Sequence, residues 1–166
     1  MRDTDMLTIR PATHADTDGI WGMLEPVIRA GETYALPRDF SREDALAYWL
    51  ATDKHTFVAL EGGALLGTYY MRANQMGGGS HVANCGYVTS VEARGRGAAA
   101  TMCEHSQDVA RRNGFTAMQF NLVVATNTGA VTLWQRLGFE IVGTLPGAFA
   151  HPTLGHVDAH IMFKTL

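Results

Sequence analysis

The sequence predicts an α+β fold, with a mixed and mainly antiparallel twisted sheet flanked by helices. The first observation is the order of the periodic segments, which is β-α-α-β-β-β-α-β-α-β-β. The second is Gly62-Gly63 between two apolar alternating runs, which is a hairpin signal and makes those two strands antiparallel neighbours. The third is size: 166 residues with 46% hydrophobic content fit one domain with a single core, spanning residues 1–166.

The first half of the chain predicts two helices between strands. Thr13 is a candidate N-cap with Asp16 three residues later, and Gly31 marks the end of that helix. Ser41 is the candidate N-cap of the next helix. The expected elements are, in order, a strand at 7–11, a helix at 14–30, a loop at 31–40, a helix at 42–49, and strands at 56–60 and 64–72.

The second half of the chain predicts strands that alternate with two helices. Gly114 is placed to terminate the first of these helices, and Gly138 the second. The expected elements are a strand at 81–90, a glycine-rich loop, a helix at 98–113, a strand at 116–124, a helix at 128–137, and strands at 139–144 and 156–164 joined by a loop.

Composition and charge exclude several classes of protein. A net charge of −3 argues against a nucleic-acid binder, which usually carries a basic excess. No apolar run approaches the ~20 residues that span a bilayer. Two cysteines suggest no disulfide framework, and no signal-like apolar segment lies near the first residue. We therefore expect a cytoplasmic protein that binds neither nucleic acid nor membrane.

The loop Arg94-Gly95-Arg96-Gly97 runs directly into the helix that begins with Ala98, Ala99 and Ala100. Small residues there leave backbone N–H groups uncovered at a helix N-terminus, where an anion such as pyrophosphate binds. The pattern G-x-G-x-x-A also fits a dinucleotide loop, but residues 114–121 lack the acidic residue that would hold the ribose. A P-loop requires Gly-Lys-Ser/Thr, which is absent. A tight turn without a ligand stays open as an alternative.

Two segments together resemble the signature regions of the GCN5-related N-acetyltransferases. They are residues 91–100, where Arg94, Gly97 and Ala99 fit the family pattern, and residues 127–139. The resemblance implies the acyl-CoA N-acyltransferase fold and acetyl-CoA as co-substrate. It implies that the backbone of Gly95, Arg96, Gly97, Ala98, Ala99 and Ala100 holds the CoA pyrophosphate. It further implies that Tyr87, Val88 and Thr89 bind the pantetheine arm as an added strand does, with Asn127 contacting the same arm.

A closer resemblance links the chain to fungal N-acetyltransferases that detoxify proline analogues such as azetidine-2-carboxylate. It rests on Asn84-Cys85-Gly86-Tyr87 and on residues 120–127. In that subfamily the asparagines that match Asn84 and Asn121 lie at the substrate and the thioester, so both are candidate catalytic residues. The acceptor implied is a small-molecule amine, such as an amino or imino acid. Glu32 and Tyr34 are expected to form one wall of the acceptor pocket, together with Asn84.

The expected chemistry is direct attack of a neutral amine on the acetyl thioester. Many relatives carry a tyrosine on the last helix as the acid for the leaving thiol, and this chain has Trp134 there. Candidate bases, acting through water, are Glu32, His81 and His151. We expect Cys85 to be buried rather than nucleophilic. We expect no metal, because the histidines near the C-terminus lack ligand spacing.

Two other functions stay open at this stage. Acetylation of a protein or peptide would require an open groove, whereas the loops at 31–40 and 145–155 are expected to close one off. A non-catalytic acyl-CoA-binding sensor is compatible with Trp134 in the place of the usual acid. A homodimer through the last strands is also compatible with the family resemblance.

Overall fold

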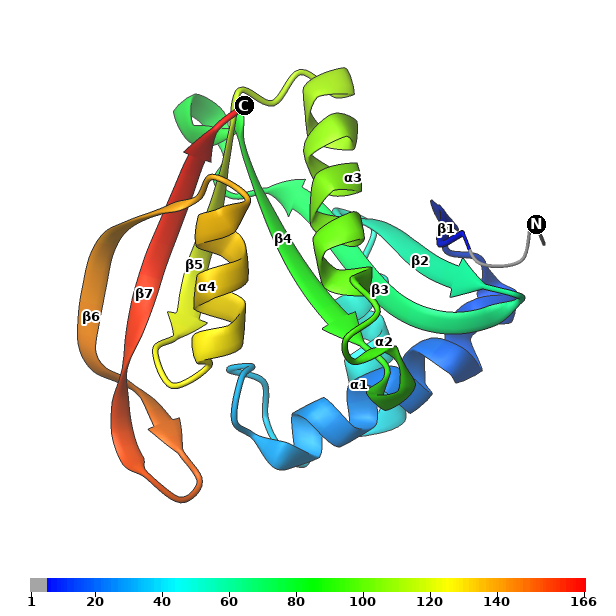
Figure 1. Cartoon of the computed structure of the whole chain (residues 1–166), viewed down its shortest axis with the longest axis horizontal. Coiled ribbons are helices and arrows are strands. Elements are labelled where there is room, and N and C mark those ends of the chain that lie inside the picture. Colours follow the sequence, from blue (N-terminus) through cyan, green and yellow to red (C-terminus); the bar gives the residue numbers. More distant parts are fainter. Residues whose placement is uncertain (1–5) are drawn as a thin grey trace.

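A computed structural model describes residues 6–166. In this part of the chain seven strands form one sheet in the order β1-β2-β3-β4-β5-β7-β6 (Figure 1). The strands are β1 (Thr8–Pro11), β2 (His55–Glu61), β3 (Ala64–Ala73), β4 (Val82–Thr89), β5 (Ala117–Val124), β6 (Glu140–His151) and β7 (Gly155–Thr165). The helices are α1 (Thr17–Ala30), α2 (Arg42–Trp49), α3 (Ala98–Arg112) and α4 (Thr128–Arg136). The predicted fold class is confirmed.

The sheet is antiparallel except between β4 and β5. These two strands are parallel and pair only at Val82 with Ala117 and at Ala83 with Met118. Beyond this point they diverge into the V that opens in the middle of Figure 1. β5 also has an irregular register towards β7 between Phe120 and Val123. The centre of the sheet is therefore open on one side of β4.

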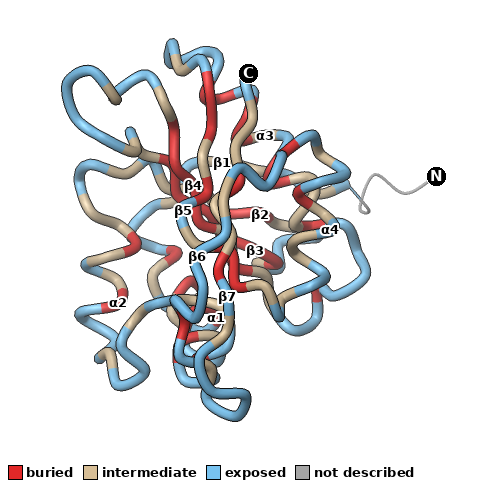
Figure 2. The backbone as a smooth tube through the Cα atoms, turned by 90° about the vertical axis from the view of Figure 1, so that its left-hand side faces the viewer, coloured by how far each residue is buried: buried red, intermediate tan, exposed pale blue. Residues whose placement is uncertain are grey.

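Helices cover both faces of the sheet and bury two clusters of apolar side chains. One cluster, under α1 and α2, includes Ile20, Leu24 and Trp49, and the indole N–H of Trp49 donates to Thr68 Oγ1 at 3.0 Å. The other includes Met102 and Cys103 of α3 with residues of the central strands. In Figure 2 the buried segments concentrate in the central strands and on the inner sides of the helices. None of the helices in residues 6–166 is long and apolar enough to cross a membrane.

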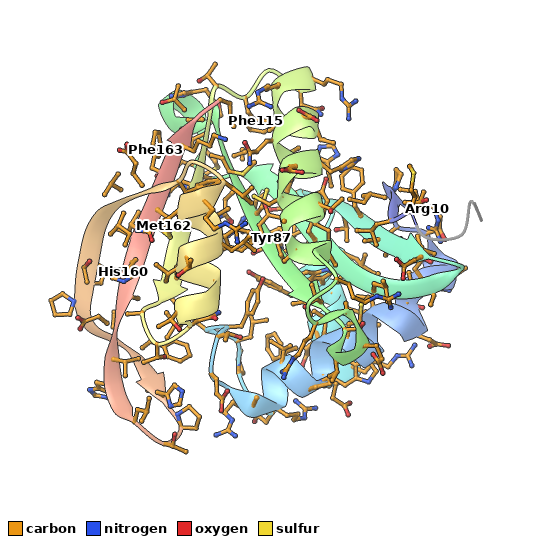
Figure 3. All side chains as sticks on the ribbon, viewed as in Figure 1. Arg10, Tyr87, Phe115, His160, Met162 and Phe163 are labelled. Atoms are coloured by element: carbon orange, nitrogen blue, oxygen red, sulfur yellow. The ribbon has the colours of Figure 1, made fainter. Side chains whose placement is uncertain are left out.

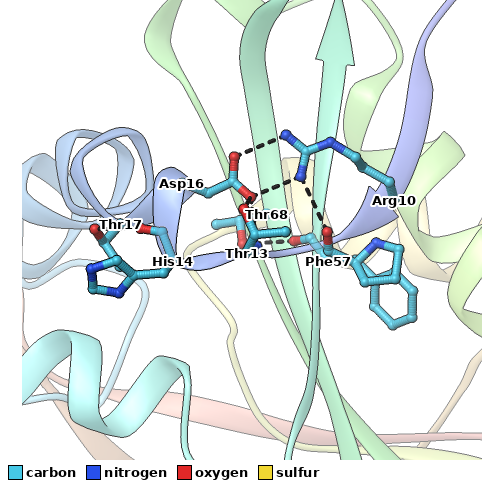
Figure 4. A network of polar contacts seen from close by, with 8 residues as sticks. Arg10, Thr13, His14, Asp16, Thr17, Phe57 and Thr68 are labelled. Carbon is cyan, nitrogen blue, oxygen red and sulfur yellow. Dashed lines mark hydrogen bonds and ion pairs between the residues drawn. The ribbon is translucent and has the colours of Figure 1, made fainter.

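Asp16, three residues after Thr13, caps the turn that leads into α1. Thr13 precedes a short 3₁₀ turn (His14–Asp16), and its N–H donates to Asp16 Oδ2 at 2.7 Å. Arg10 of β1 donates two hydrogen bonds to the same carboxylate, at 2.8 and 2.9 Å (Figure 4). The Arg10 hydrogen bonds lower the pKa of Asp16 to about 2. This contact ties the edge of the sheet to the first helix.

Helix ends and turns agree with the sequence at several points. Ser41 Oγ accepts from the N–H of Asp44 at 3.0 Å, as expected of an N-cap. Gly31 ends α1 with a φ of 66°, in the left-handed region that favours glycine. The hairpin between β2 and β3 turns at Gly62-Gly63.

The prediction for the C-terminal region is wrong in its extents. Residues 145–151 continue β6, and β7 begins at Gly155, so the expected long loop is a three-residue turn. Pro146 and Gly147 lie at an irregularity in the ladder between Leu145 and Phe149. Because β6 is an edge strand, a proline and a glycine are tolerated there without ending it. Residues 145–155 therefore form a hairpin, not a loop that closes a groove.

Candidate active site

The divergence of β4 and β5 opens a cavity of about 1070 Å³. Its wall comes from both strands, from α1, from residues 32–36 and from α4. At the point where the strands part, Asn84 Nδ2 donates to the backbone oxygen of Gln119 on β5 at 3.0 Å. This bond continues the link between the strands by one side chain after the backbone pairing has ended. The strands that carry Asn84 and Asn121 therefore lie on the two sides of the cavity.

The glycine-rich loop lies beyond the C-terminal end of β4. Gly95 and Gly97 both have φ of 75°, and a second hollow of about 220 Å³ is formed by this loop and the start of α3. Within residues 6–166, the N–H groups of Gly97, Ala98, Ala99 and Ala100 have no hydrogen-bond acceptor. Four unpaired donors at the N-terminus of a 15-residue helix form the kind of site that binds a phosphate group.

The two arginines of the loop point in different directions. Arg94 lines both the cavity and the hollow. Arg96 instead forms an ion pair with Glu61 at the end of β2. Its predicted contribution to cofactor binding is therefore confined to its backbone in this conformation, while Arg94 keeps its side chain at the site.

The backbone of β4 presents alternate residues to the gap. Leu66 O accepts from Ser90 N–H and Val82 O accepts from Asn74 N–H, so even-numbered residues bond to β3. Tyr87 and Thr89 then direct their N–H and C=O groups towards the gap, whereas those of Val88 face β3. An extended ligand that adds to this edge would bond to Tyr87 and Thr89. Val88 lines the cavity with its side chain.

Tyr87 also anchors the floor of the cavity. Its side chain lies at the centre of the molecule between β4, α3 and α4 (Figure 3). The hydroxyl is 2.7 Å from Ser106 Oγ on α3, and the ring packs 5.1 Å from the ring of Trp134 on α4. Trp134 is buried and lines the cavity. Since the indole N–H can donate a hydrogen bond but is far too weak an acid to protonate a thiolate, α4 supplies no acid at this position.

Tyrosines line the end of the cavity opposite the glycine loop. Tyr34 donates its hydroxyl to Tyr87 O at 3.0 Å, which closes the loop at 31–40 onto the edge of β4. A Cβ at Gly86 would lie 2.7 Å from the Tyr70 ring and 2.9 Å from the Tyr34 hydroxyl. Glycine is therefore required for both rings to lie over the strand. Burial raises the pKa of Tyr34 and of Tyr70 far above 10, so both remain protonated.

The predicted asparagines all line the cavity. Asn84 is buried, and Asn121 is exposed within β5 where the ladder to β7 changes register; its Nδ2 donates to Asn74 Oδ1 at 2.7 Å. Asn127 precedes α4 as predicted, but its side chain makes no capping hydrogen bond. The amide of Asn127 is therefore free to face the cavity.

The three candidate bases separate clearly. Glu32 lines the cavity, whereas His81 and His151 do not. His151 Nδ1 instead accepts the N–H of Thr153 at 3.2 Å and so stabilises the β6–β7 turn. Burial raises the pKa of Cys85 to about 12, which keeps it as a thiol and agrees with a structural role. Across residues 6–166 no three His, Cys, Asp or Glu side chains gather where they could hold a metal ion.

Among the residues of the cavity wall that sequence reasoning missed are three with polar side chains at the acceptor end: Tyr48 of α2, and Tyr70 and Arg72 of β3. The Tyr48 and Tyr70 hydroxyls lie 3.3 Å apart. Tyr70 pairs with Gly86 and Arg72 pairs with Asn84 across the antiparallel ladder. The one signal in the sequence was the charge of Arg72 at the end of an apolar strand. Only the pairing of β3 with β4 shows that this residue lies beside Asn84.

Comparisons with known proteins agree on one family. The chain matches the sequence profile of the acetyltransferase (GNAT) family over residues 21–139. A solved GCN5-related N-acetyltransferase from Kribbella flavida is 42% identical, with a TM-score of 0.92, over 96% of this chain and 98% of that one. A phosphinothricin acetyltransferase from Sinorhizobium meliloti, solved with acetyl-CoA, shares the fold at 21% identity, with a TM-score of 0.85 over 96% and 88% of the two chains.

A curated relative is also similar in sequence. The N-acetyltransferase aca1 of Schizosaccharomyces pombe is 37% identical over 101 residues. The match covers 59% of this chain and 47% of that protein, so the chain spans about half the length of this relative.

Proposed function

Because the chain belongs to the acetyltransferase (GNAT) family, an N-acetyltransferase family with acetyl-CoA as co-substrate, we propose that its acceptor is the amine of a small amino or imino acid. The observation that carries this proposal is the shape of the cavity. One end meets the unpaired N–H groups of the glycine loop, and the other is lined by residues 32–36, which Tyr34 ties to β4, and by Tyr48 and Tyr70. An acceptor end narrowed by this loop and these rings suits a small molecule rather than a protein surface.

The cofactor follows β4 from the glycine loop to the point where the strands part. The pyrophosphate lies on the N–H groups of residues 97–100, and the pantetheine arm bonds to Tyr87 and Thr89. The thioester then lies near Asn84 and Asn121. The amide side chains orient the amine or the thioester, and a backbone N–H directed into the gap stabilises the developing oxyanion.

The chemical step is a direct transfer. The neutral amine attacks the carbonyl carbon, its N–C bond forms, and the C–S bond breaks with its electron pair on sulfur. The amine proton passes through water towards Glu32, the one predicted base that lines the cavity. Thiolate leaves without a tyrosine from α4, since thiols titrate at about 8.5 and the anion is a stable leaving group.

The first test is CoA release from acetyl-CoA with amino acids, imino acids including azetidine-2-carboxylate, polyamines, aminoglycosides and short peptides. Saturable release with an amino or imino acid supports the proposal. Release with peptides alone would replace it with protein acetylation. CoA binding without release from any acceptor would favour a sensor.

Two further predictions about the whole protein accompany this proposal. We propose that it works in the cytoplasm, which localisation of a tagged chain would test. We also propose a homodimer through the edge strand β6, where Ile141, Val142 and Leu145 are exposed. Sedimentation at micromolar concentration would test this assembly.

A further inference from the structure

Arg72 places a positive charge at the acceptor end of the cavity. Two arginines line this cavity, and they lie towards opposite ends of β4. Arg94 belongs to the glycine loop, while Arg72 lies beside Asn84 near the start of the strand. Five residues of extended strand separate Asn84 from Thr89, which is roughly 17 Å at ~3.3 Å per residue. Arg72 is therefore too far along the strand to serve the pyrophosphate.

The guanidinium of Arg72 has little to neutralise it. Its polar contact is from Nε to Asn84 Oδ1 at 3.3 Å. Among residues 6–166, none of the ion pairs includes Arg72. Its two terminal nitrogens therefore keep their donors free for a ligand. A guanidinium that faces a cavity with free donors in a fork matches a carboxylate in charge and in geometry.

A second cation, Lys54, lies beside Tyr48 and Tyr70. Lys54 Nζ lies 4.0 Å from the centre of the Tyr48 ring and 5.1 Å from that of Tyr70. It donates to the backbone oxygen of Tyr48 at 2.7 Å. The Arg72 guanidinium lies 5.9 Å from the centre of the Tyr70 ring. Lys54 lies behind the tyrosines and does not line the cavity, and Glu32 is an acidic residue of the same end. Arg72 and Lys54 outnumber that one carboxylate, so this end favours an acceptor that carries a negative group.

The position of Arg72 also limits where the amine lies on the acceptor. Arg72 contacts Asn84, and Asn84 contacts Gln119 at the point where the strands part. A carboxylate of the acceptor that is bound by Arg72 would therefore be separated from the expected thioester only by the side chain of Asn84. An acceptor with amine and carboxylate on one carbon fits this short span, beside the Tyr34 and Tyr70 side chains that cover Gly86.

We propose that Arg72 binds the carboxylate of an α-amino or α-imino acid acceptor and so determines substrate specificity. This inference rests on the proposed small-molecule activity. It adds that the acceptor carries a carboxylate, which acetyl transfer to an amine does not itself require. A peptide N-terminus lacks an adjacent carboxylate, and a polyamine carries the wrong charge.

The test compares acceptors that differ only in the carboxylate. L-Proline is paired with L-prolinamide, and azetidine-2-carboxylate with azetidine, in the CoA-release assay. The wild type is expected to prefer each acid. Arg72→Met is expected to raise KM for the acids by on the order of 10- to 100-fold, the loss of a charge-assisted bond. The variant should leave KM for acetyl-CoA unchanged and should lose more activity with the acids than with the matched amines that lack a carboxylate, and Arg72→Lys should fall between.

A matched control is Arg111→Met, which removes an exposed arginine of α3 that pairs with Asp108. It should change none of these constants. Equal use of proline and prolinamide by the wild type, or an equal loss on both in Arg72→Met, would overturn the role of Arg72 while leaving acetyl transfer intact.

A binding measurement separates this inference from the proposed activity. If no amine releases CoA, the small-molecule activity fails, and calorimetric titration of proline into the CoA-bound protein decides the question for Arg72. Binding by the wild type that Arg72→Met abolishes supports the carboxylate site. Absent or equal binding in the two proteins refutes it.

Discussion

Gly97→Glu tests the assignment of the pyrophosphate to the glycine loop. A Cβ at this position meets no atom within 4 Å, so a longer side chain is not excluded by packing. The new carboxylate would project beside the unpaired N–H groups of Ala98, Ala99 and Ala100. It would repel the anion that those groups are expected to hold, and the hydrogen bonds of the sheet would stay intact.

Two effects contribute, and Gly97→Gln separates them. A side chain at a φ of 75° costs either variant about 1 to 2 kcal/mol of stability, because non-glycine residues disfavour this region. Only glutamate adds charge. At an effective dielectric constant of ~40 and a separation of ~6 Å, each phosphate charge repels a carboxylate by about 1.4 kcal/mol. Two charges give about 3 kcal/mol, which is roughly a 100-fold rise in Kd.

The assay is calorimetric titration of CoA into the wild type and both variants at low and high salt. Gly97→Gln is expected to bind within a few-fold of the wild type. Gly97→Glu should bind roughly 100-fold more weakly, and the difference should shrink as salt screens the repulsion. Equal affinity of the two variants at low salt would refute a phosphate site at this loop. Thermal unfolding should show the same loss of stability in both.

Three further predictions concern the cavity and the first helix. Gly86→Ala places a methyl group 2.7 Å from the Tyr70 ring, so kcat/KM for the acceptor should fall roughly 10-fold or more as the rings move, with Kd for CoA unchanged in titration. Asn121→Ala should lower kcat more than it weakens CoA binding, and a fully active variant in the release assay would contradict a catalytic role. The lowered pKa of Asp16 stabilises the fold above about pH 4, and this stabilisation should be lost as pH falls towards 2. Because Arg10 is partly exposed, Asp16→Asn should cost only about 1 to 2 kcal/mol at pH 7 and flatten acid unfolding followed by circular dichroism.

The elements of the fold were predictable wherever local chemistry specifies them. Ser41 and Gly31 mark helix ends by side-chain capping and by positive φ, and both functions depend on a few neighbouring residues. The error at residues 145–151 has the opposite origin. Pro146 and Gly147 read as a loop in isolation, yet the edge position of β6 lets the strand continue past them. The order in which strands pair determines that position, and the sequence of one segment alone does not show it.

The candidate site likewise has one part that local sequence predicts and one part that depends on tertiary structure. The glycine loop is contiguous in sequence, and its prediction required only that a strand precede it and a helix follow. The acceptor end is assembled from α1, the loop at 31–40, α2, β3, β4 and β5. Glu32 and Tyr34 were identified only through a family resemblance, and Arg72 was not identified at all. Its function arises because the β3–β4 ladder pairs it with Asn84.

The same register explains why one arginine on a strand becomes a candidate for specificity. Residues paired across an antiparallel ladder project on the same face, so Tyr70 and Arg72 lie on the face to which Gly86 and Asn84 belong. A shift of one residue would turn Arg72 towards α3 and the apolar cluster around Met102, where a charge without a partner is costly. Burial of that cluster therefore fixes the register, and the register holds the guanidinium at the cavity. The packing that stabilises the sheet also determines which charge the acceptor meets.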